Sequence, residues 1–459
     1  MHGVKLFTGA AVSVLLMAVA GPAPVLADTI DAALVRAYQN NPQLNAQRAQ
    51  VHSVDENVPQ ALSGYRPTVN LSASLGYQYQ DTTQGGVEFH GTGVPRGAGL
   101  TVNQNLYNGN RTANQVRAAE SGVSGAREGL RVIEQQVLFL AASTYMDYLQ
   151  NSAIVEVQRS NVRVLEQTLK QTRDRFDVGE VTRTDVAQSE ASLAAGKTTE
   201  LQAEATLTAT RANFRRVIGN EPQNLGPGSP VDRFLPSTLN AAIELGLTEN
   251  PSVTAAMYGI DVNFLQVKIN EGALLPSVSV QANVQQVYDQ VLSVQQTFTA
   301  SAIAQVSVPL YQGGAEYALI RQSKENLAQQ RLNLEMTRDQ ARANVVQFWG
   351  QLTATKAQVA SAQAQVTASE VALNGVREEA KAGQRTTLDV LNAQQALVNA
   401  RVALVQAQHD RVVASYNVLM AVGRLSPQVL GLKTTTYDPS VHYHQVRDSW
   451  SGVRTPDGR

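Results

Sequence analysis

The sequence contains no cysteine. The chain therefore forms no disulfide, offers no thiolate to a metal and is not expected to carry a lipid on an N-terminal cysteine. After residue 27, no segment reaches the roughly 18 consecutive apolar residues that a transmembrane helix needs. The 37 basic residues nearly balance the 38 acidic ones, and the net charge of −1 does not favour nucleic acid or another polyanion as a partner.

Aromatic residues are also scarce, at 5% of the chain against a hydrophobic total of 43%. A compact core would need more large side chains, so we expect long helices that pack through small residues. Proline is absent from Asn110 to Val178, which leaves room for one helix of about 100 Å. Apolar residues recur at every seventh position in two segments, which predicts coiled-coil packing. These residues are Tyr148, Val155, Val162, Leu169 and Phe176 in the first segment and Leu352, Val359, Val366 and Leu373 in the second.

Two short stretches divide the long helical segments into hairpins. In each stretch, a glycine can end one helix in the left-handed conformation, and a Thr-x-x-Asp sequence can begin the next helix as a capping box. The stretches lie 204 positions apart, since 383 − 179 and 389 − 185 give the same offset. We therefore predict hairpin tips at 179–185 and 383–389, built on Gly179, Thr182 and Asp185 and on Gly383, Thr386 and Asp389.

The repeat extends over nearly the whole chain. Asn41-Pro42, for example, has its counterpart in Asn250-Pro251. Residues at the start have the charged, apolar and small-residue regions of a secretory signal. The sequence predicts these segments: a signal peptide at 1–27, a first structural repeat at 28–221, a proline- and glycine-rich linker at 222–236, a second repeat at 237–430 and a polar C-terminal tail, extended or disordered, at 431–459.

The residue pattern changes to a period of two in four places, about 67–79, 98–107, 277–287 and 300–310. This alternation is typical of a β-strand with one apolar and one polar face. The Gly-rich segment 80–96 is interpreted as a plain loop. The apolar faces include Leu71 and Val280. The polar faces contain Asn70, Ser72, Ser74, Asn103, Asn105, Ser279, Gln281 and Asn283. Tyrosines lie near the strand ends, at Tyr77, Tyr79, Tyr107, Tyr288 and Tyr311.

Strands of this length, with one apolar face, match the span of a bilayer. Backbone groups in lipid must all be hydrogen-bonded, so such strands close into a barrel, and four strands are too few. The chain must therefore share a barrel with copies of itself. Two copies would give about eight strands and a filled interior, and three would give about twelve and an open lumen. The polar inner faces favour the open lumen, and the tyrosines suit the membrane interfaces.

The helical hairpins adjoin the strands and must project from one side of the membrane, expected to be the periplasm of a Gram-negative bacterium. From Asp28 to about Leu430 the chain resembles the TolC family of outer-membrane efflux and secretion channels. The resemblance rests on Val178-Gly179-x-Val181-x-x-Thr184-Asp185-Val186, on Gly383-x-Arg385-Thr386-x-x-Asp389-Val390-Leu391 and on Ala33 with Asn41-Pro42-x-Leu44. It implies a mixed α and β membrane protein, a homotrimer whose barrel of about twelve strands continues into an α-helical coiled-coil tunnel.

The resemblance also implies a gated, passive exit duct in a tripartite export system, for multidrug efflux or type I secretion. The partners would be a periplasmic adaptor, an inner-membrane ABC or proton-driven transporter, and outer-membrane lipid. No cofactor or enzymatic activity is expected, because the sequence shows no nucleophile motif, phosphate loop or metal-ligand cluster. Two alternatives stay open: a self-contained porin for small solutes, which needs no long hairpins, and a periplasmic coiled-coil adaptor, which needs no amphipathic strands.

Carried over to this sequence, the resemblance assigns a gate to the hairpin tips. Arg385 would pair with Thr184 and Asp185 of a neighbouring hairpin and hold the tip closed, and Asp389 would line the constriction as a ring of acids. Asn392 stands where relatives often carry a second acidic residue, so this tip is expected to be less acidic. A simpler interpretation is that the two aspartates only cap helices and that Arg385 is a solvated charge.

Overall fold

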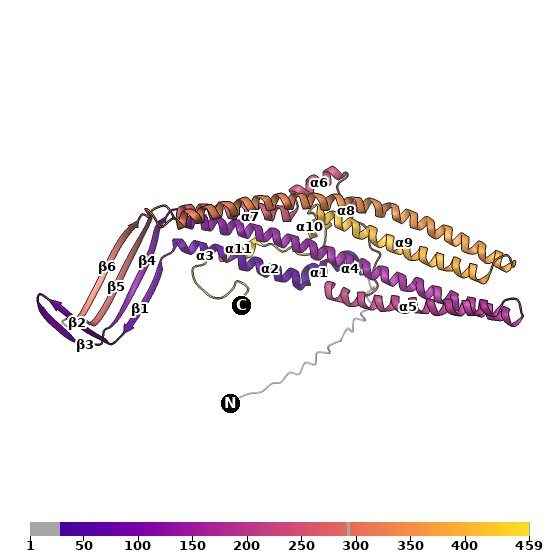
Figure 1. Ribbon diagram of the computed structural model, residues 1–459, viewed down its shortest axis with the longest axis horizontal. Helices are drawn as coiled ribbons and strands as arrows, with labels where there is room; N and C mark the ends of the chain where they lie inside the picture. Colours follow the sequence, from indigo (N-terminus) through magenta and orange to yellow (C-terminus); the bar gives the residue numbers. More distant parts are fainter. Residues whose placement is uncertain (1–27, 292–293, 459) are drawn as a thin grey trace, which may run out of the picture.

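The computed structural model describes residues 28–291 and 294–458. The predicted signal peptide, 1–27, lies outside these residues. Figure 1 shows an elongated chain with a β-sheet at one end, helices along the long axis and two hairpin tips at the other end. Within the described ranges, none of the helices combines the length and the apolar character needed to span a bilayer.

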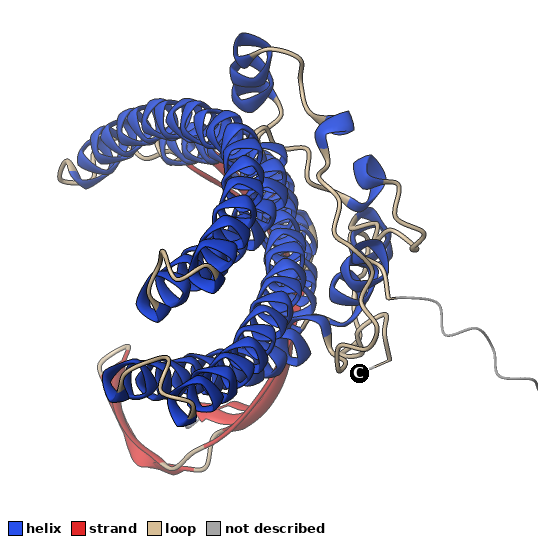
Figure 2. Cartoon of the chain, turned by 90° about the vertical axis from the view of Figure 1, so that its right-hand side faces the viewer, coloured by secondary structure: helices blue, strands red, loops and turns tan. Residues whose placement is uncertain are grey.

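Four long helices form the two hairpins. The outgoing helices α4 (Arg111–Asp177) and α8 (Ala315–Lys381) contain 67 residues each, or about 100 Å at 1.5 Å per residue. The returning helices α5 (Arg183–Ile218) and α9 (Thr387–Ala421) are roughly half as long. Seen from the tip end in Figure 2, the helices form a curved wall that is open on one side.

Shorter helices continue this wall between the returning helices and the sheet, where α2 and α7 pack on the outgoing helices. Asparagine and proline start the two repeat-related helices, because Asn41 and Asn250 accept backbone N–H bonds while Pro42 and Pro251 need none. The short helices are α1 (Ile30–Asn40), α2 (Pro42–Asp55), α3 (Asn57–Leu62), η1 (Ser63–Tyr65), η2 (Asp232–Phe234), α6 (Leu239–Thr248), α7 (Pro251–Gly272), α10 (Pro427–Leu430) and α11 (Ser440–Val446).

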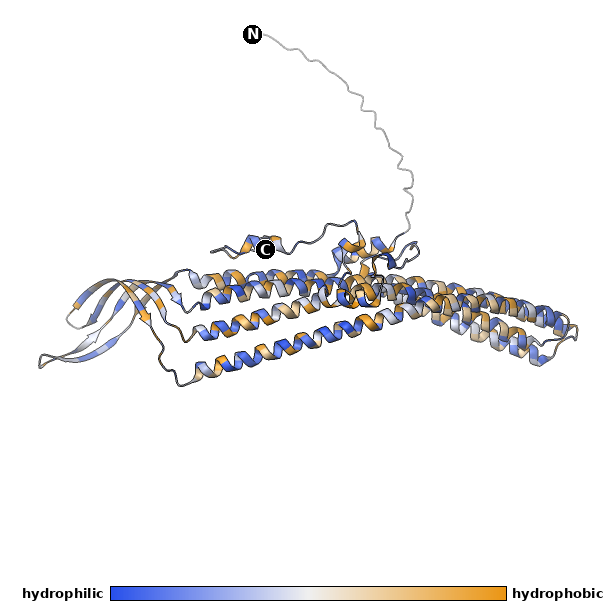
Figure 3. Cartoon of the chain, turned by 90° about the horizontal axis from the view of Figure 1, so that it is seen from above, coloured by the Kyte–Doolittle hydropathy of each residue, from blue (hydrophilic) through white to orange (hydrophobic). Residues whose placement is uncertain are grey.

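An antiparallel sheet carries the amphipathic strands in the order β1-β4-β5-β6. Their bounds are Thr68–Leu75, Arg96–Asn108, Ser277–Val291 and Val294–Ser307. The register sets Leu71 opposite Leu100, and Leu100 opposite Val284, so the apolar residues share one face. Thr101 and Asn283 pair on the other face, with their side-chain oxygens 3.3 Å apart. Hydrophobic residues recur along these strands in Figure 3, and Leu71 is 79% exposed in the single chain.

The interpretation of segment 80–96 as a plain loop is wrong. β2 (Gln78–Gln84) and β3 (Val87–Gly93) form a separate antiparallel hairpin beyond the sheet. Gly85 and Gly86, with φ of 61° and 85°, make its two-residue turn. Glycine adopts positive φ at little cost, and a Gly-Gly pair is therefore a strong hairpin signal.

The C-terminal tail was expected to be extended or disordered, and the structure differs from both expectations. It contains α11, and His442 in that helix is 7% exposed, with its Nδ1 atom 3.0 Å from Oδ2 of the fully buried Asp55. Since a buried carboxylate needs a polar partner, this contact holds the tail against α2.

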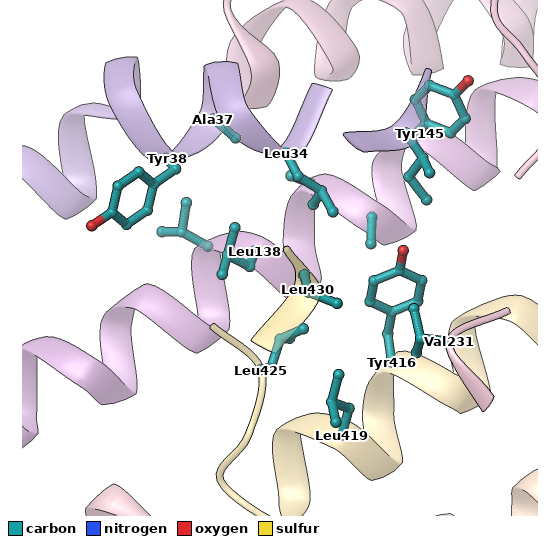
Figure 4. Packing of buried hydrophobic residues seen from close by; sticks show 14 of the residues in the cluster. Leu34, Ala37, Tyr38, Leu138, Tyr145, Val231, Tyr416, Leu419, Leu425 and Leu430 are labelled. Atoms are coloured by element: carbon teal, nitrogen blue, oxygen red, sulfur yellow. The ribbon is translucent and has the colours of Figure 1, made fainter. Parts of the chain in front are cut away.

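The largest hydrophobic cluster lies half way along the molecule, where the returning helices end. Figure 4 shows Tyr145 from α4, Leu34 from α1 and Tyr416 from α9 around this centre. The linker closes over it, because Val231 is buried there and the Tyr145 hydroxyl donates to the Gly226 carbonyl at 2.6 Å. The core thus fixes the two hairpins relative to each other and leaves the tips as a separate polar end.

Candidate gate at the hairpin tips

The two tips have the same backbone geometry. Gly179 and Gly383 end the outgoing helices with φ of 81° and 78°. Their N–H groups donate to Phe176 and Ala380, at 2.9 and 3.2 Å. The next residue donates back five positions in each tip, from Glu180 to Arg175 and from Gln384 to Glu379, both at 2.9 Å. These bonds form a Schellman motif, which requires the left-handed residue that glycine supplies.

Each returning helix then begins with a complete capping box. The carboxylate of Asp185 accepts the N–H of Thr182 at 2.9 Å and its hydroxyl at 2.7 Å. Asp389 accepts the same two groups of Thr386, at 2.9 and 2.8 Å. The hydrogen bonds from Thr182 and Thr386 lower the pKa of the two carboxyl groups below the ordinary value. Both aspartates are therefore ionised at neutral pH.

In each tip an ion pair joins the end of the outgoing helix to the turn, and these two pairs have opposite polarity. In the first tip, Arg175 Nε lies 3.0 Å from Oε2 of Glu180. In the second, Glu379 occupies the repeat position of the arginine (379 − 204 = 175), and its Oε2 lies 2.9 Å from Nε of Arg385. The basic group thus comes from the helix in one tip and from the turn in the other.

Among the described residues of one chain, Arg385 pairs with Glu379 and does not contact Asp185 or Thr184. Thr184 is exposed on the first turn of α5, and Asn392 is exposed one turn after Asp389 in α9. The structure therefore places all the predicted tip residues at one end of the molecule. The expected lock between Arg385 and a neighbouring hairpin stays a prediction about contacts between chains.

A buried polar connection between the hairpins was not predicted from the sequence. Arg377 in α8 donates to Gln394 at 3.0 Å, and Gln394 in α9 donates to Asn161 in α4 at 3.3 Å. Gln394 and Asn161 are 7% and 4% exposed. The link lies about 10 Å along α9 from the tip, at 1.5 Å per residue. The signal was weak, since polar residues also stand at the repeat positions of the two amides, Glu190 for Gln394 and Gln365 for Asn161, and nothing in the sequence marks one pair as buried.

The sheet and the tips together define a class of protein. An apolar strand face adapted to lipid continues into long helices that end in charged turns, which is the arrangement of a channel wall with a tunnel attached. Within residues 28–291 and 294–458, no group of three or more His, Asp or Glu side chains is arranged as a metal site.

Sequence and structure comparisons identify the family. The model of the outer membrane efflux protein family matches residues 33–220 and 242–424, one stretch in each repeat, and the chain belongs to this family. Its sequence is 41% identical to the outer membrane efflux protein BepC of Brucella suis, over 95% of this chain and 94% of that protein. It is 24% identical to the alkaline protease secretion protein AprF of Pseudomonas aeruginosa, over 68% and 66% of the two chains.

A solved structure shows the same fold. The CmeC outer membrane channel of Campylobacter jejuni superposes with a TM-score of 0.76 at 16% identity, covering 91% of this chain and 89% of that chain. The predicted membership of the TolC family, the duplicated mixed fold and the outer-membrane location are therefore confirmed.

Proposed function

We propose that three copies of this chain share one barrel of about twelve strands and one helical tunnel, and that the assembly is a gated, passive exit duct. The open four-stranded sheet carries this proposal. Its outer strands, β1 and β6, each leave one edge unpaired in the single chain. An unpaired edge is unstable in lipid, and pairing β6 of one copy with β1 of the next removes every edge.

Two alternatives fit the structure less well. A periplasmic adaptor would have no use for a sheet whose apolar residues, such as Leu71 and Phe298, are 79% and 66% exposed. A self-contained porin would gain nothing from hairpins of about 100 Å. Such hairpins suit a duct that must reach an adaptor and an inner-membrane transporter, of the ABC or the proton-driven type, across the periplasm.

Multidrug efflux is the first candidate for the transported cargo, because the similarity to BepC, named an efflux protein, covers nearly the whole chain. Protein secretion is the second candidate, since AprF is named a protease secretion protein but is less similar. A Gram-negative strain without its own channel distinguishes them. Expression of this chain should restore resistance to small antibiotics under the first proposal, and export of a secreted protease under the second.

The gate is proposed to close through contacts between neighbouring copies. Glu379 occupies only Nε of Arg385, so the two terminal nitrogens can bind a second carboxylate. Thr182 occupies only Oδ2 of Asp185, so Oδ1 can accept such a bond. The lock between Arg385 and Asp185 can therefore form without breaking either internal contact. Asp389 and Asn392 would then line the constriction.

Purification in mild detergent tests the shared barrel. Sedimentation should give a trimer that resists dissociation, because its strands are hydrogen-bonded across the chain boundaries. A monodisperse monomer with its full content of β-structure would refute the shared barrel. That result would leave the family assignment untouched.

A further inference from the structure

The C-terminal segment 431–458, here called the C-terminal strap, follows the outside of the helical wall toward the sheet. Its successive contacts are made with residues successively nearer to β1. The Tyr437 N–H donates to the Tyr38 hydroxyl at 3.0 Å, His442 lies 3.0 Å from Asp55, and Arg66 donates to the Ser449 carbonyl at 2.6 Å. The strap therefore runs parallel to α1, α2 and α3 and reaches the start of the sheet.

Several contacts hold the strap in this path. Val446 is 4% exposed, and His442 is stacked on His52 with the ring centres 4.0 Å apart. The guanidinium groups of Arg48 and Arg127 lie over the rings of Tyr437 and Tyr443, at 5.0 and 5.2 Å. The strap is thus part of the folded structure, and its position near the sheet is fixed.

After Ser449 the strap turns back. Gly452 has a φ of 114°, and Asp457 has returned to the level of α2, where its Oδ2 lies 4.0 Å from Nδ1 of His52. The residues closest to the sheet are therefore 450–453. Trp450 and Val453 in this turn are 71% and 99% exposed. Two apolar side chains therefore remain largely on the surface at this place, although one face of the Trp450 ring is covered by Arg66.

The turn lies close to the start of β1. The Arg66 guanidinium is 4.7 Å from the centre of the Trp450 ring. From Arg66 the chain needs three residues, about 10 Å when extended, to reach Val69, the first apolar residue of the β1 face. The polar layer of a bilayer is roughly 5–8 Å thick on each side, and Trp is enriched there. Tyr107 and Tyr311, 40% and 77% exposed, mark the same end of the strands.

We infer that the turn of the C-terminal strap is a membrane anchor, in which Trp450 and Val453 insert into the phospholipid headgroup layer of the periplasmic leaflet. Arg66 packs against the face of the Trp450 ring that is turned toward the protein, and its positive charge can interact with the lipid phosphates. The strap then connects α1 and α2 to the membrane surface from outside the tunnel. This inference uses the outer-membrane location of the family and does not depend on the cargo or on the gate.

Tryptophan fluorescence tests the anchor, because the chain has only two tryptophans. Trp349→Phe leaves Trp450 as the reporter. Trp450→Phe leaves Trp349, which lies in α8 about 50 Å from the sheet end of that helix and serves as the matched control. The full chain is inserted into phosphatidylethanolamine–phosphatidylglycerol vesicles with plain or brominated acyl chains. Emission of Trp450 should fall at least about twofold in brominated vesicles, as expected for an interfacial ring, while emission of Trp349 stays constant. An unquenched Trp450 in inserted protein overturns the inference.

A second probe avoids the substitution of Trp349. The chain lacks cysteine, so Val453→Cys introduces a single site for a nitroxide label, and Val178→Cys, 72% exposed in the wild type at a hairpin tip, is the control. The label at 453 should relax faster with oxygen than with a water-soluble nickel complex, and the label at 178 should show the reverse. Preferential access of nickel at 453 places the turn in water. Access by neither reagent places it against another protein chain, and either result refutes the anchor.

Discussion

Replacing Leu71 by arginine tests which face of the sheet meets lipid. Leu71 is 79% exposed in the single chain and lies opposite Leu100 on the apolar face. Its neighbour Asn70 is directed to the other face, opposite Thr101. Asn70→Arg is therefore a matched control, since it adds the same side chain one position away on the side of the proposed lumen.

The structure sets the size of the effect. Leu71 is three residues into β1, about 10 Å along the strand or roughly 8 Å along the membrane normal at the usual tilt. The apolar band is about 25 Å tall, so this depth is about two thirds of the way to the midplane. An arginine costs about 2–4 kcal/mol at the midplane and little at the interface, which gives about 2 kcal/mol here. Three copies per barrel would lose about 6 kcal/mol, or roughly four powers of ten in assembly.

Outer-membrane fractionation and gel mobility of unheated samples measure the amount of assembled protein. We expect Leu71→Arg to reduce the trimer sharply and Asn70→Arg to leave most of it intact. Equal loss in both variants would show that the strand faces have been assigned incorrectly. Equal tolerance would show that this face does not contact lipid.

Three further predictions concern the tips and the polar connection between the hairpins. Arg385→Ala should raise conductance in planar bilayers, because it removes one partner of each lock between chains. Arg183→Ala, in the other tip, is the control and should leave conductance unchanged. Equal conductance of the parent and both variants would exclude the lock. Hydrogen bonds from Thr386 lower the pKa of Asp389, so its negative charge should persist as the pH falls to the ordinary aspartate value of about 4 and be lost only below it. Cation preference should follow that titration and be missing at every pH in Asp389→Asn; a loss of preference well above that value would contradict the assignment. Asn161→Ala should destabilise the folded chain in thermal unfolding by about 1–3 kcal/mol, because it leaves Gln394 buried with one bond fewer. An unchanged stability would show that this buried bond does not hold the two hairpins together.

The tips and strands were predictable because their signals are local. A glycine followed by Thr-x-x-Asp specifies the end of one helix and the start of the next within a few residues, and Gly179 and Thr182 adopt the expected geometry. The alternation of apolar and polar residues within one strand likewise identifies its two faces. The register of the sheet then only has to align the apolar faces of neighbouring strands. These features depend little on the rest of the chain.

The remaining features depend on partners far away in the sequence. His442 is a polar residue in a polar segment, and only its contact with Asp55, 387 positions earlier, makes it part of the structure. Asn161 and Gln394 are 233 positions apart. No periodicity marks such pairs, because each residue alone is compatible with an exposed position.

The opposite polarity of the tip ion pairs leads to a last prediction, about the order of the tips around a ring. Arg175 and Glu379 occupy the same repeat position with opposite charge, as the ion pairs with Glu180 and Arg385 show. A first tip placed beside a second tip therefore brings opposite charges together. Two first tips or two second tips placed side by side would bring equal charges together. Three copies of a chain with two hairpins give a ring in which the tips alternate, so every junction is of the favourable kind.

The variant that carries both Arg175→Glu and Glu180→Arg keeps an internal pair but gives the first tip the polarity of the second. Each exposed contact contributes about 0.2–1 kcal/mol, and the effect is repeated at every junction. We expect this variant to assemble normally and to conduct more than the parent, with the difference shrinking at high salt as screening increases. Conductance equal to that of the parent at low salt would show that charge complementarity between tips does not help to close the channel.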